Sequence, residues 1–282
     1  MLKVENLRKK YHSFLLDGIS FTLPEGYILG FIGQNGAGKS TTIKCLTGVN
    51  PYDEGEVTVF GKDFRTHSLE ILQDVGFSSG AMDCYPNEKV EKIGRAYGMF
   101  FQNYDNEKFL RLCKTFHIDP SKKVRELSQG MKVKLGIALA LSHDAKLIIL
   151  DEPTSGLDPV AREELLDLLQ KIMEQGNRSI LFSTHVTSDL DKCADYILFI
   201  NDGKQILFDT KDNIVDGHAL VRGKKEALTD SLKDRLIGHK VTPIGFTGLI
   251  KREDLTEYDD VETSAPTLED IMVYYVKEEI VL

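Results

Sequence analysis

The chain has 282 residues, of which 41% are hydrophobic and 28% charged, values typical of a globular protein with room for one large domain and a smaller one. Its net charge of −9 argues against a nucleic-acid-binding protein, because such proteins need a basic surface to neutralise phosphates. The four cysteines form no CxxC pair, the start has no signal-peptide pattern, and the longest apolar runs are too short to span a bilayer, so we expect a cytoplasmic protein with reduced thiols and no transmembrane segment.

Strands and helices are predicted to alternate over most of the chain. Apolar–polar alternation, with turns at Asp17-Gly18 and at residues 24–26, predicts antiparallel strands at the N-terminus. The later alternation of strands and helices predicts a mainly parallel sheet covered by helices. In chain order these elements are a strand at Tyr27–Ile32, a helix at Thr41–Leu46, a pair of strands around Glu56–Phe60 and Val75–Phe77, helices within 85–118, a helix at Ser128–Ser142, a strand at Leu147–Leu150, a helix at Pro159–Gln175 and a strand at Ser179–Ser183.

The pattern changes after about Gly217. Short apolar segments there alternate with helical patterns, which predicts a small α+β extension. The segments are Ala219–Val221, Lys240–Ile244 and Gly248–Ile250, with helices at Lys225–Leu236 and Leu268–Lys277. Eight acids without a Lys or Arg between Glu253 and Asp270 indicate a solvated acidic surface. We therefore predict two domains, 1–218 and 219–282, with a helical subdomain at about 81–142 in the first.

A glycine-rich phosphate loop follows the strand that ends at Ile32. The segment Gly33–Ser40 fits the pattern GxxxxGK[ST], and it has the strand before and the helix after that this pattern requires. Its glycines let backbone N–H groups approach phosphate oxygens, and the positive end of the next helix points at them. Lys39 is expected to reach the β- and γ-phosphates, and Ser40 to bind Mg²⁺. The predicted nucleotide-binding residues of this segment are Asn35, Gly36, Gly38, Lys39, Ser40 and Thr41.

Two acids end the buried strand Leu147–Leu150. At the end of that strand Asp151 is placed beside the phosphate loop, where it can hold Mg²⁺ through water together with Ser40. Glu152 then points to the position of an attacking water, and such a base contributes about 10²–10⁴-fold in rate. The alternative is that the two acids cap the next helix, for which Pro153 and Thr154 give some support.

The order of further motifs resembles that of the ABC-type ATPases. Leu127–Met131 resembles the signature LSGGQ of that family, and it precedes the carboxylate strand as the family requires. Asp158 resembles the acid of the D-loop and His185 the switch histidine, while Tyr11 lies where the family stacks an aromatic ring on adenine. The resemblance covers about residues 1–218. It implies a P-loop NTPase of ABC type, with an antiparallel β subdomain and a helical subdomain, that uses ATP and Mg²⁺.

The resemblance also implies a head-to-tail dimer that holds two Mg-ATP between its subunits. Ser128, Gln129 and Gly130 of one subunit would contact the γ-phosphate of ATP bound to the other, at the start of a helix that Ser128 can cap. A lone histidine is more often structural, but the position of His185 after a buried strand favours contact with the γ-phosphate and a role in hydrolysis. The dimer could be a homodimer or a heterodimer.

Two positions depart from the family pattern. Gln129 and Met131 replace the usual glycine and glutamine of the signature, while Ser128 and Gly130 are retained, so we expect this half-site to function. Gly80 stands where the family usually has the Q-loop glutamine, and Gln73 lies too early to replace it. A water or Ser79 could take that place, and the hypothesis is that coupling to the partner is altered.

Within the family, the chain resembles the ATPase subunits of ABC-2-type exporters. The reasons are the LSxGM signature, the single nucleotide-binding domain and a C-terminal extension that includes 267–272. A separate membrane permease would then hold the chain at the cytoplasmic face of the membrane, by way of the segment Ala81–Tyr104. Within this segment Met82, Cys84, Tyr85 and Pro86 are candidates for the docking groove, whereas Tyr97, Phe100 and Phe101 are expected to be core.

Other classes remain as alternatives. A soluble ABC ATPase that acts on ribosomes usually has two such domains in one chain, whereas this chain has one. The DNA-associated type has a long coiled coil between its motifs. A GTPase would need an NKxD motif, which is missing. We expect no nucleic-acid partner and, from the scattered histidines, no structural metal. The cargo and the role of 219–282 stay open, the latter between dimer stabilisation, shielding of the nucleotide and regulation.

Overall fold

The computed structural model describes residues 1–79, 85–255 and 261–276. The chain forms two compact units, Met1–Gln205 and Ile206–Leu282, and each is described by itself. The domain division at 218/219 that the sequence indicates stays a prediction.

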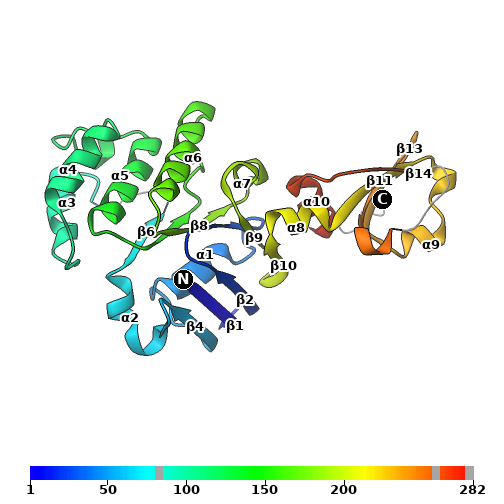
Figure 1. Cartoon of the computed structure of the whole chain (residues 1–282), viewed down its shortest axis with the longest axis horizontal. Coiled ribbons are helices and arrows are strands. Elements are labelled where there is room, and N and C mark those ends of the chain that lie inside the picture. Colours follow the sequence, from blue (N-terminus) through cyan, green and yellow to red (C-terminus); the bar gives the residue numbers. More distant parts are fainter. Residues whose placement is uncertain (80–84, 256–260, 277–282) are drawn as a thin grey trace. The chain divides into compact units, whose positions relative to one another are not determined.

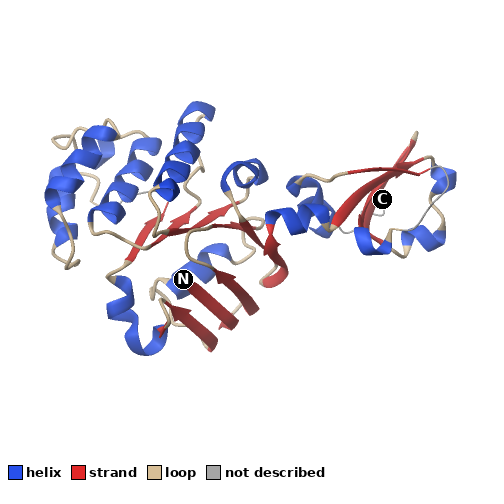
Figure 2. Ribbon diagram, viewed as in Figure 1, coloured by secondary structure: helices blue, strands red, loops and turns tan. Residues whose placement is uncertain are grey.

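Ten strands of the described chain form one mixed sheet in the order β5-β4-β1-β2-β10-β9-β3-β8-β7-β6. Its antiparallel part consists of β1 (Leu2–Lys10), β2 (Leu15–Leu23), β4 (Glu54–Val59) and β5 (Lys62–Asp63). Its parallel part consists of β3 (Ile28–Ile32), β6 (Val75–Ser79), β7 (Leu147–Asp151), β8 (Ser179–Thr184) and β9 (Tyr196–Asn201). Figures 1 and 2 show both parts, which agree with the expected α/β class and its antiparallel subdomain.

Helices accompany the parallel strands. Three of them are α1 (Lys39–Leu46), α6 (Pro159–Glu174) and α7 (Thr187–Cys193), whereas α2 (Phe64–Leu72) lies mainly against the antiparallel strands β4 and β5 (Figure 1). Three more gather beside the β6 edge of the sheet (Figure 1): α3 (Val90–Gly98), α4 (Asn106–Thr115) and α5 (Gln129–Ser142), with a 3₁₀ turn at Val124–Glu126. No helix in the described part of the chain is both long and apolar enough to cross a membrane.

Small residues let helix α5 lie close against strand β6. A Cβ on Gly76 would lie 2.3 Å from the Cβ of Ala140, and one on Gly136 would lie 2.2 Å from Oγ of Ser78. Both distances are far inside van der Waals contact, so these positions must stay without a side chain. The close packing fixes the helical group against the strand that leads to the predicted Q-loop position.

Three details of the first unit differ from the prediction. Asp17 and Gly18 lie inside β2, where the register shifts and Gly18 has φ = 75°, so a β-bulge and not a turn uses this dipeptide. Strands β4 and β6 are separated by eight positions of the sheet order and therefore do not pair with each other. Helix α2 lies between them in sequence, and neither it nor the strands β9 and β10 (Lys204–Thr210) was predicted.

The second unit begins within β10 and contains an antiparallel sheet in the order β12-β13-β11-β14. Its strands are β11 (His218–Gly223), β12 (Leu236–Thr242), β13 (Gly245–Lys251) and β14 (Val261–Ser264). Its helices are α8 (Lys211–Asp216), α9 (Asp230–Lys233) and α10 (Leu268–Val276), with 3₁₀ turns at Lys225–Ala227 and Arg252–Asp254.

A small apolar core of its own stabilises the second unit. Its buried members are Ala219, Val221, Leu232, Phe246 and Ile250. The helix predicted at Lys225–Leu236 is wrong in length: only short turns form there, and Leu236 already begins strand β12. The α+β character predicted for this part of the chain is confirmed.

Candidate functional site

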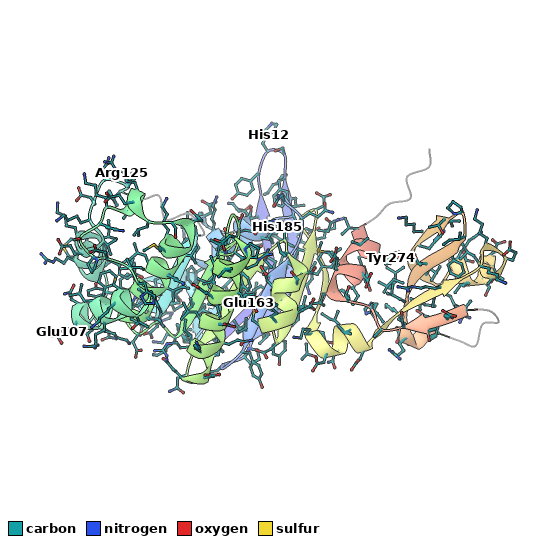
Figure 3. The ribbon with its side chains drawn as sticks, turned by 90° about the horizontal axis from the view of Figure 1, so that it is seen from above. His12, Glu107, Arg125, Glu163, His185 and Tyr274 are labelled. Carbon is teal, nitrogen blue, oxygen red and sulfur yellow. The ribbon has the colours of Figure 1, made fainter. Side chains whose placement is uncertain are left out.

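The candidate site lies where four neighbouring parallel strands end. Strands β3, β8, β7 and β6 are adjacent and in register, with Ile32 beside Thr184 and Asp151 beside both Ser183 and Ser79. Gly33 and His185 directly follow β3 and β8, and Figure 3 labels His185. Ligands of open parallel sheets bind at such carboxyl ends, so the predicted motifs meet where the fold favours a binding site.

Backbone geometry explains two glycines of the phosphate loop. Gly38 has φ = 111° and caps the start of α1, and a Cβ there would lie 2.9 Å from the ring of Phe14. A Cβ on Gly33 would lie 2.5 Å from the carbonyl oxygen of Ile200. Glycine fits at both positions because it has no Cβ and tolerates a positive φ. The loop leads directly into the N-terminus of α1, and a helix N-terminus favours an anion.

Lys39 lies at the centre of this loop, and only 5% of it is exposed. Its Nζ donates hydrogen bonds to the carbonyl oxygens of Gly33 at 2.7 Å and Gln34 at 3.2 Å. The same nitrogen lies 3.1 Å from Oε1 of Glu152. A buried ammonium must be compensated in this way, and the contact joins the phosphate loop to the acid that follows β7.

The two acids after β7 are held in different ways. Asp151 accepts a hydrogen bond of 2.6 Å from Oγ of Ser183. Glu152 has φ = 50°, and its Oε2 lies 2.8 Å from Nδ1 of His185. The alternative in which the acids cap the next helix is wrong, because Asp158 caps α6 by accepting from the N–H groups of Val160 and Ala161.

A pocket of about 540 Å³ opens between the phosphate loop and the β1–β2 hairpin, whose tip carries His12 in Figure 3. This volume is within the usual range for small-molecule sites. Predicted residues that line it are Tyr11, Asn35, Gly36, Gly38, Lys39, Ser40, Thr41 and Glu152. The lining residues that the sequence did not single out are Ser13, Phe14, Gln34, Lys44 and Asn50.

Asn50 is the most informative of the residues that sequence reasoning missed. Its Nδ2 donates a 2.8 Å hydrogen bond to the phenol oxygen of Tyr11, a residue that is 38% exposed. Lys9 Nζ lies 5.7 Å from the centre of the same ring. These contacts hold an aromatic surface at the rim of the pocket. The sequence offered no signal for Asn50, because 39 residues separate it from its partner.

The oxygen donors at the site fit a magnesium ion. Ser40 lines the pocket, and Asp151 ends β7, two strands from the strand that leads into the phosphate loop, so a hydroxyl and a carboxylate are the oxygen groups that would hold the ion, the carboxylate through water. Within the described residues no cluster of three or more His, Cys, Asp or Glu side chains could hold a metal ion on its own. Mg²⁺ is typically bound in this way, by one or two protein oxygens with phosphates and water completing the octahedron.

Comparison with known proteins agrees with the family resemblance found in the sequence. The family model described as "ABC transporter" matches residues 16–155. The chain is 35% identical over 209 residues to the bacitracin transport ATP-binding protein BcrA of Bacillus licheniformis, covering 72% of this chain and 68% of that protein. It is 33% identical over 208 residues to the Nod factor export ATP-binding protein I of Burkholderia lata, covering 71% and 68%. The chain belongs to the ABC transporter ATP-binding proteins.

A solved structure supports the fold. An ATP-binding subunit of an ABC transporter superposes with a TM-score of 0.68 and 26% identity, covering 76% of this chain and 91% of that one. The chain is therefore an ABC transporter ATPase, as predicted, and its phosphate loop and strand-end acids belong to an ATP-binding cassette.

The ABC signature lies apart from the pocket. Ser128 is the N-cap of α5, and its Oγ accepts a 3.3 Å hydrogen bond from the N–H of Met131. Ser128, Gln129 and Gly130 are absent from the residues that line the pocket, and Asp158 at the start of α6 is absent as well. The individual roles assigned to these residues stay predictions.

The region of the predicted Q-loop is described only in part. Gly80, Met82 and Cys84 lie outside the described residues. The side chain of Gln73 is hydrogen-bonded to the loop after α3. Its amide donates to the carbonyl oxygen of Phe100 and accepts from the N–H of Gln102, both at 2.9 Å. This agrees with the expectation that Gln73 does not replace the missing glutamine.

The prediction that Phe100 belongs to the core of the helical subdomain is wrong. Phe100 is 73% exposed, because it lies after the end of α3 on the loop that Gln73 holds. Tyr97 and Phe101 are partly buried and stack on each other with their ring centres 4.4 Å apart. Phe101 also stacks on the buried ring of His143, at 3.9 Å.

Proposed function

We propose that this ATPase works as a head-to-tail dimer and drives export through a separate membrane permease of the ABC-2 type. The observation that supports this proposal is that the phosphate-loop pocket and the signature, the two halves of the expected ATP site, lie apart within one chain. The pocket is lined by the phosphate loop, the N-terminal hairpin and Glu152, whereas Ser128 to Gly130 lie at the start of another helix. A second subunit is then required to bring its own signature against the γ-phosphate of ATP bound in the pocket.

Within the closed site each residue has a distinct task. Lys39 neutralises the β- and γ-phosphates, and the ring of Tyr11 supports the adenine. Ser40 and Asp151 would hold Mg²⁺, which would supply positive charge to the phosphates. Glu152 orients the attacking water and takes its proton, while His185, 2.8 Å from Glu152, holds that carboxylate and contacts the γ-phosphate. Asp158 lies at the start of α6, where it meets the partner subunit.

Exposed apolar side chains support a membrane partner. Tyr85, Met99 and Phe100 are 70%, 79% and 73% exposed, and all three lie in the segment that the family uses for docking. Met99 and Phe100 are neighbours at the end of α3, and adjacent large apolar side chains that are this exposed are typical of binding surfaces. Relatives named for bacitracin transport and Nod factor export support an export role for this chain as well.

Co-purification tests the membrane partner. An affinity-tagged full-length chain should retain an integral membrane protein in mild detergent, and a Phe100→Asp variant should retain at least 10-fold less of it. Leu69→Asp, which places a charge at an exposed apolar residue of α2 that has no proposed role, should not change the yield. If wild-type and Phe100→Asp chains retain the same membrane protein equally, the docking surface is wrong. If no membrane protein is retained while ATP hydrolysis is normal, the transport role is wrong.

The Gly80 position defines a further expectation. If a glutamine at this position normally reports permease contact to the site, its replacement by glycine makes hydrolysis less dependent on that contact. A Gly80→Gln variant should change the ATPase rate, the Mg²⁺ dependence or transport. Unchanged values of all three would mean that the substitution has no consequence.

A further inference from the structure

Ser183 connects the two acids of the site through one hydroxyl group. It lies in β8, directly beside Asp151 in β7, and it is fully buried at 0% exposure. Its Oγ donates a 2.6 Å hydrogen bond to Oδ1 of Asp151. The same oxygen accepts a 2.9 Å hydrogen bond from the N–H of Glu152. A single side chain therefore contacts both the predicted metal ligand and the backbone of the predicted base.

The backbone at Glu152 needs such support. Its φ of 50° lies in the left-handed region, which is unfavourable for a residue with a side chain. The N–H of Glu152 is shared between Oγ of Ser183 at 2.9 Å and the carbonyl oxygen of Ser183 at 3.1 Å. The bend turns the chain out of the strand and directs the Glu152 carboxylate toward Lys39 and His185. Loss of the hydroxyl would leave this bend with one acceptor.

The chemistry of the hydroxyl makes the two contacts dependent on each other. A serine hydroxyl can donate one hydrogen bond, and here Asp151 accepts it. The lone pairs of Oγ therefore remain available to accept a hydrogen bond from the N–H of Glu152. Hydrogen bonds to a metal-binding carboxylate fix its orientation, and loss of such a partner typically costs about 10–100-fold in metal affinity or activity.

We propose that Ser183 is a positioning residue for ATP hydrolysis, which holds Asp151 in its Mg²⁺-binding orientation and Glu152 in its water-orienting one. Ser183 is not among the residues that line the nucleotide pocket, so it acts through these two acids and not on ATP. The inference rests on the roles proposed for Asp151 and Glu152, and it adds a specific contribution from the neighbouring strand.

The same strand supplies a matched control. Ser179 lies at the other end of β8, and it too is 0% exposed. Its Oγ donates to the carbonyl oxygen of Pro24 at 2.9 Å and accepts from the N–H of Gly26 at 3.0 Å. Ser179→Ala therefore removes a buried hydroxyl that also donates one hydrogen bond and accepts one, far from the acids in the strand register. It measures the cost of losing a buried serine as such.

The experiment compares full-length Ser183→Ala, Ser183→Thr and Ser179→Ala with the wild type. We expect Ser183→Ala to lower kcat roughly 10- to 100-fold and to raise the Mg²⁺ concentration for half-maximal rate about 10-fold. The KM for ATP should change less than about 2-fold, because no pocket contact is lost. Ser183→Thr keeps the hydroxyl and should recover most of kcat. Ser179→Ala should lower the melting temperature to a similar extent as Ser183→Ala with kcat unchanged.

A second measurement does not depend on turnover. Titration of Mg²⁺ into each chain with a fluorescent ATP analogue should show the same shift to higher Mg²⁺ for Ser183→Ala, and none for Ser179→Ala. If Ser183→Ala does not fold, Ser183→Cys, which keeps the size but bonds weakly, should show an intermediate loss of kcat. Equal kcat in Ser183→Ala and Ser179→Ala, or a failure of threonine to restore activity above alanine, would overturn the proposal.

Two further variants separate this inference from the function on which it depends. Asp151→Asn and Glu152→Gln should each lose most hydrolysis. If both lose it while Ser183→Ala turns over normally, the positioning role alone is wrong. If both hydrolyse ATP at the wild-type rate, the assignment of the two acids is wrong, whatever Ser183 does.

Discussion

At the scale of single residues, Tyr11 and Asn50 set the rim of the nucleotide pocket. The 2.8 Å hydrogen bond between their side chains holds the tyrosine ring where its face remains available. An exposed ring would otherwise sample several rotamers, and a base that stacks on it would have to restrict them. In the role proposed for Tyr11, the bond from Asn50 would therefore prepare the ring to stack on the adenine.

The ring of Tyr11 should contribute to nucleotide affinity. Stacking of a base on an aromatic ring is worth about 1–3 kcal/mol, so Tyr11→Ala should weaken ATP binding roughly 10-fold. Tyr11→Phe keeps the ring and loses the hydrogen bond to Asn50, so its affinity should stay within about 3-fold of the wild type. Equilibrium titration with a fluorescent ATP analogue measures both. Equal affinities of the alanine variant and the wild type would exclude Tyr11 as the adenine contact.

The sequence was sufficient for those site residues that belong to one contiguous motif. The glycine spacing of Gly33–Ser40 and the acids after a buried strand could be predicted because local geometry determines them. Contacts between distant segments could not be predicted. The Tyr11–Asn50 bond and the Ser183–Asp151 bond join residues 39 and 32 positions apart, and only the folded sheet brings them together.

At the scale of elements, the contact of α5 with β6 depends on an exact fit of small residues. Because the distance between Cβ atoms would be 2.3 Å, Gly76→Ala must push the helix away from the strand. Overpacking of this kind costs about 1–3 kcal/mol of stability, and urea denaturation should show that loss. The double variant Gly76→Ala with Ala140→Gly removes the contact of 2.3 Å, leaving contacts of 3.2 Å, and should lose less stability than the sum of the single variants. Strict additivity would show that this contact does not determine the packing.

His143 makes the folding stability of the same helical group depend on pH. The ring is fully buried at the end of α5 and stacks on Phe101, and burial lowers the pKa of His143 below its usual value of 6.5. Above pH 6.5 the histidine is neutral in the folded and unfolded chains and has no effect. As pH falls below 6.5 the unfolded chain takes up the proton first, so the folded state loses stability until the pH reaches the lowered pKa.

The consequence can be measured as a difference between two variants. Between pH 7.5 and 5.5 the wild type should lose on the order of 1 kcal/mol more unfolding free energy than His143→Phe, which stacks but does not titrate. Urea denaturation at both pH values gives the comparison, and the other titrating groups cancel between the two chains. An equal pH dependence of both proteins would show that His143 is not buried as a neutral ring.

Element types were predicted better than element pairings. The buried strands at Leu147–Leu150 and Ser179–Ser183 and the helix at Pro159–Gln175 follow from hydrophobic pattern and length. Asp17-Gly18 was mistaken for a turn because Asp-Gly is a strong turn signal, and a bulge uses the same positive φ. The strands β9 and β10 were missed, although Tyr196–Asn201 is a short apolar run that meets the criteria for a buried strand.

At the scale of the whole molecule, the chain consists of two units with separate cores. Every residue that lines the nucleotide pocket lies between positions 11 and 152, and the second unit buries its own apolar cluster. A chain that ends at Gly217 retains strand β10 and all pocket residues. ATP binding by the first unit should therefore not depend on the second.

Truncation tests this independence and one of the roles left open for the second unit. The chain ending at Gly217 should bind ATP within about 2-fold of the full-length affinity, since no pocket contact is removed. Gel filtration with ATP then shows whether the second unit stabilises the dimer, because a truncated chain that remains monomeric would require that role. A loss of ATP binding in the monomer would contradict the separation of the two units.

Glu152 is proposed to act as the base in a site that a second subunit completes. The most direct measurement is ATP hydrolysis together with gel filtration of full-length Glu152→Gln in the presence of Mg-ATP. The amide keeps the shape but cannot take a proton, so we predict normal ATP binding, a loss of rate of at least about 100-fold and a stable ATP-bound dimer. Hydrolysis at the wild-type rate, or ATP binding without any dimer, would contradict the account.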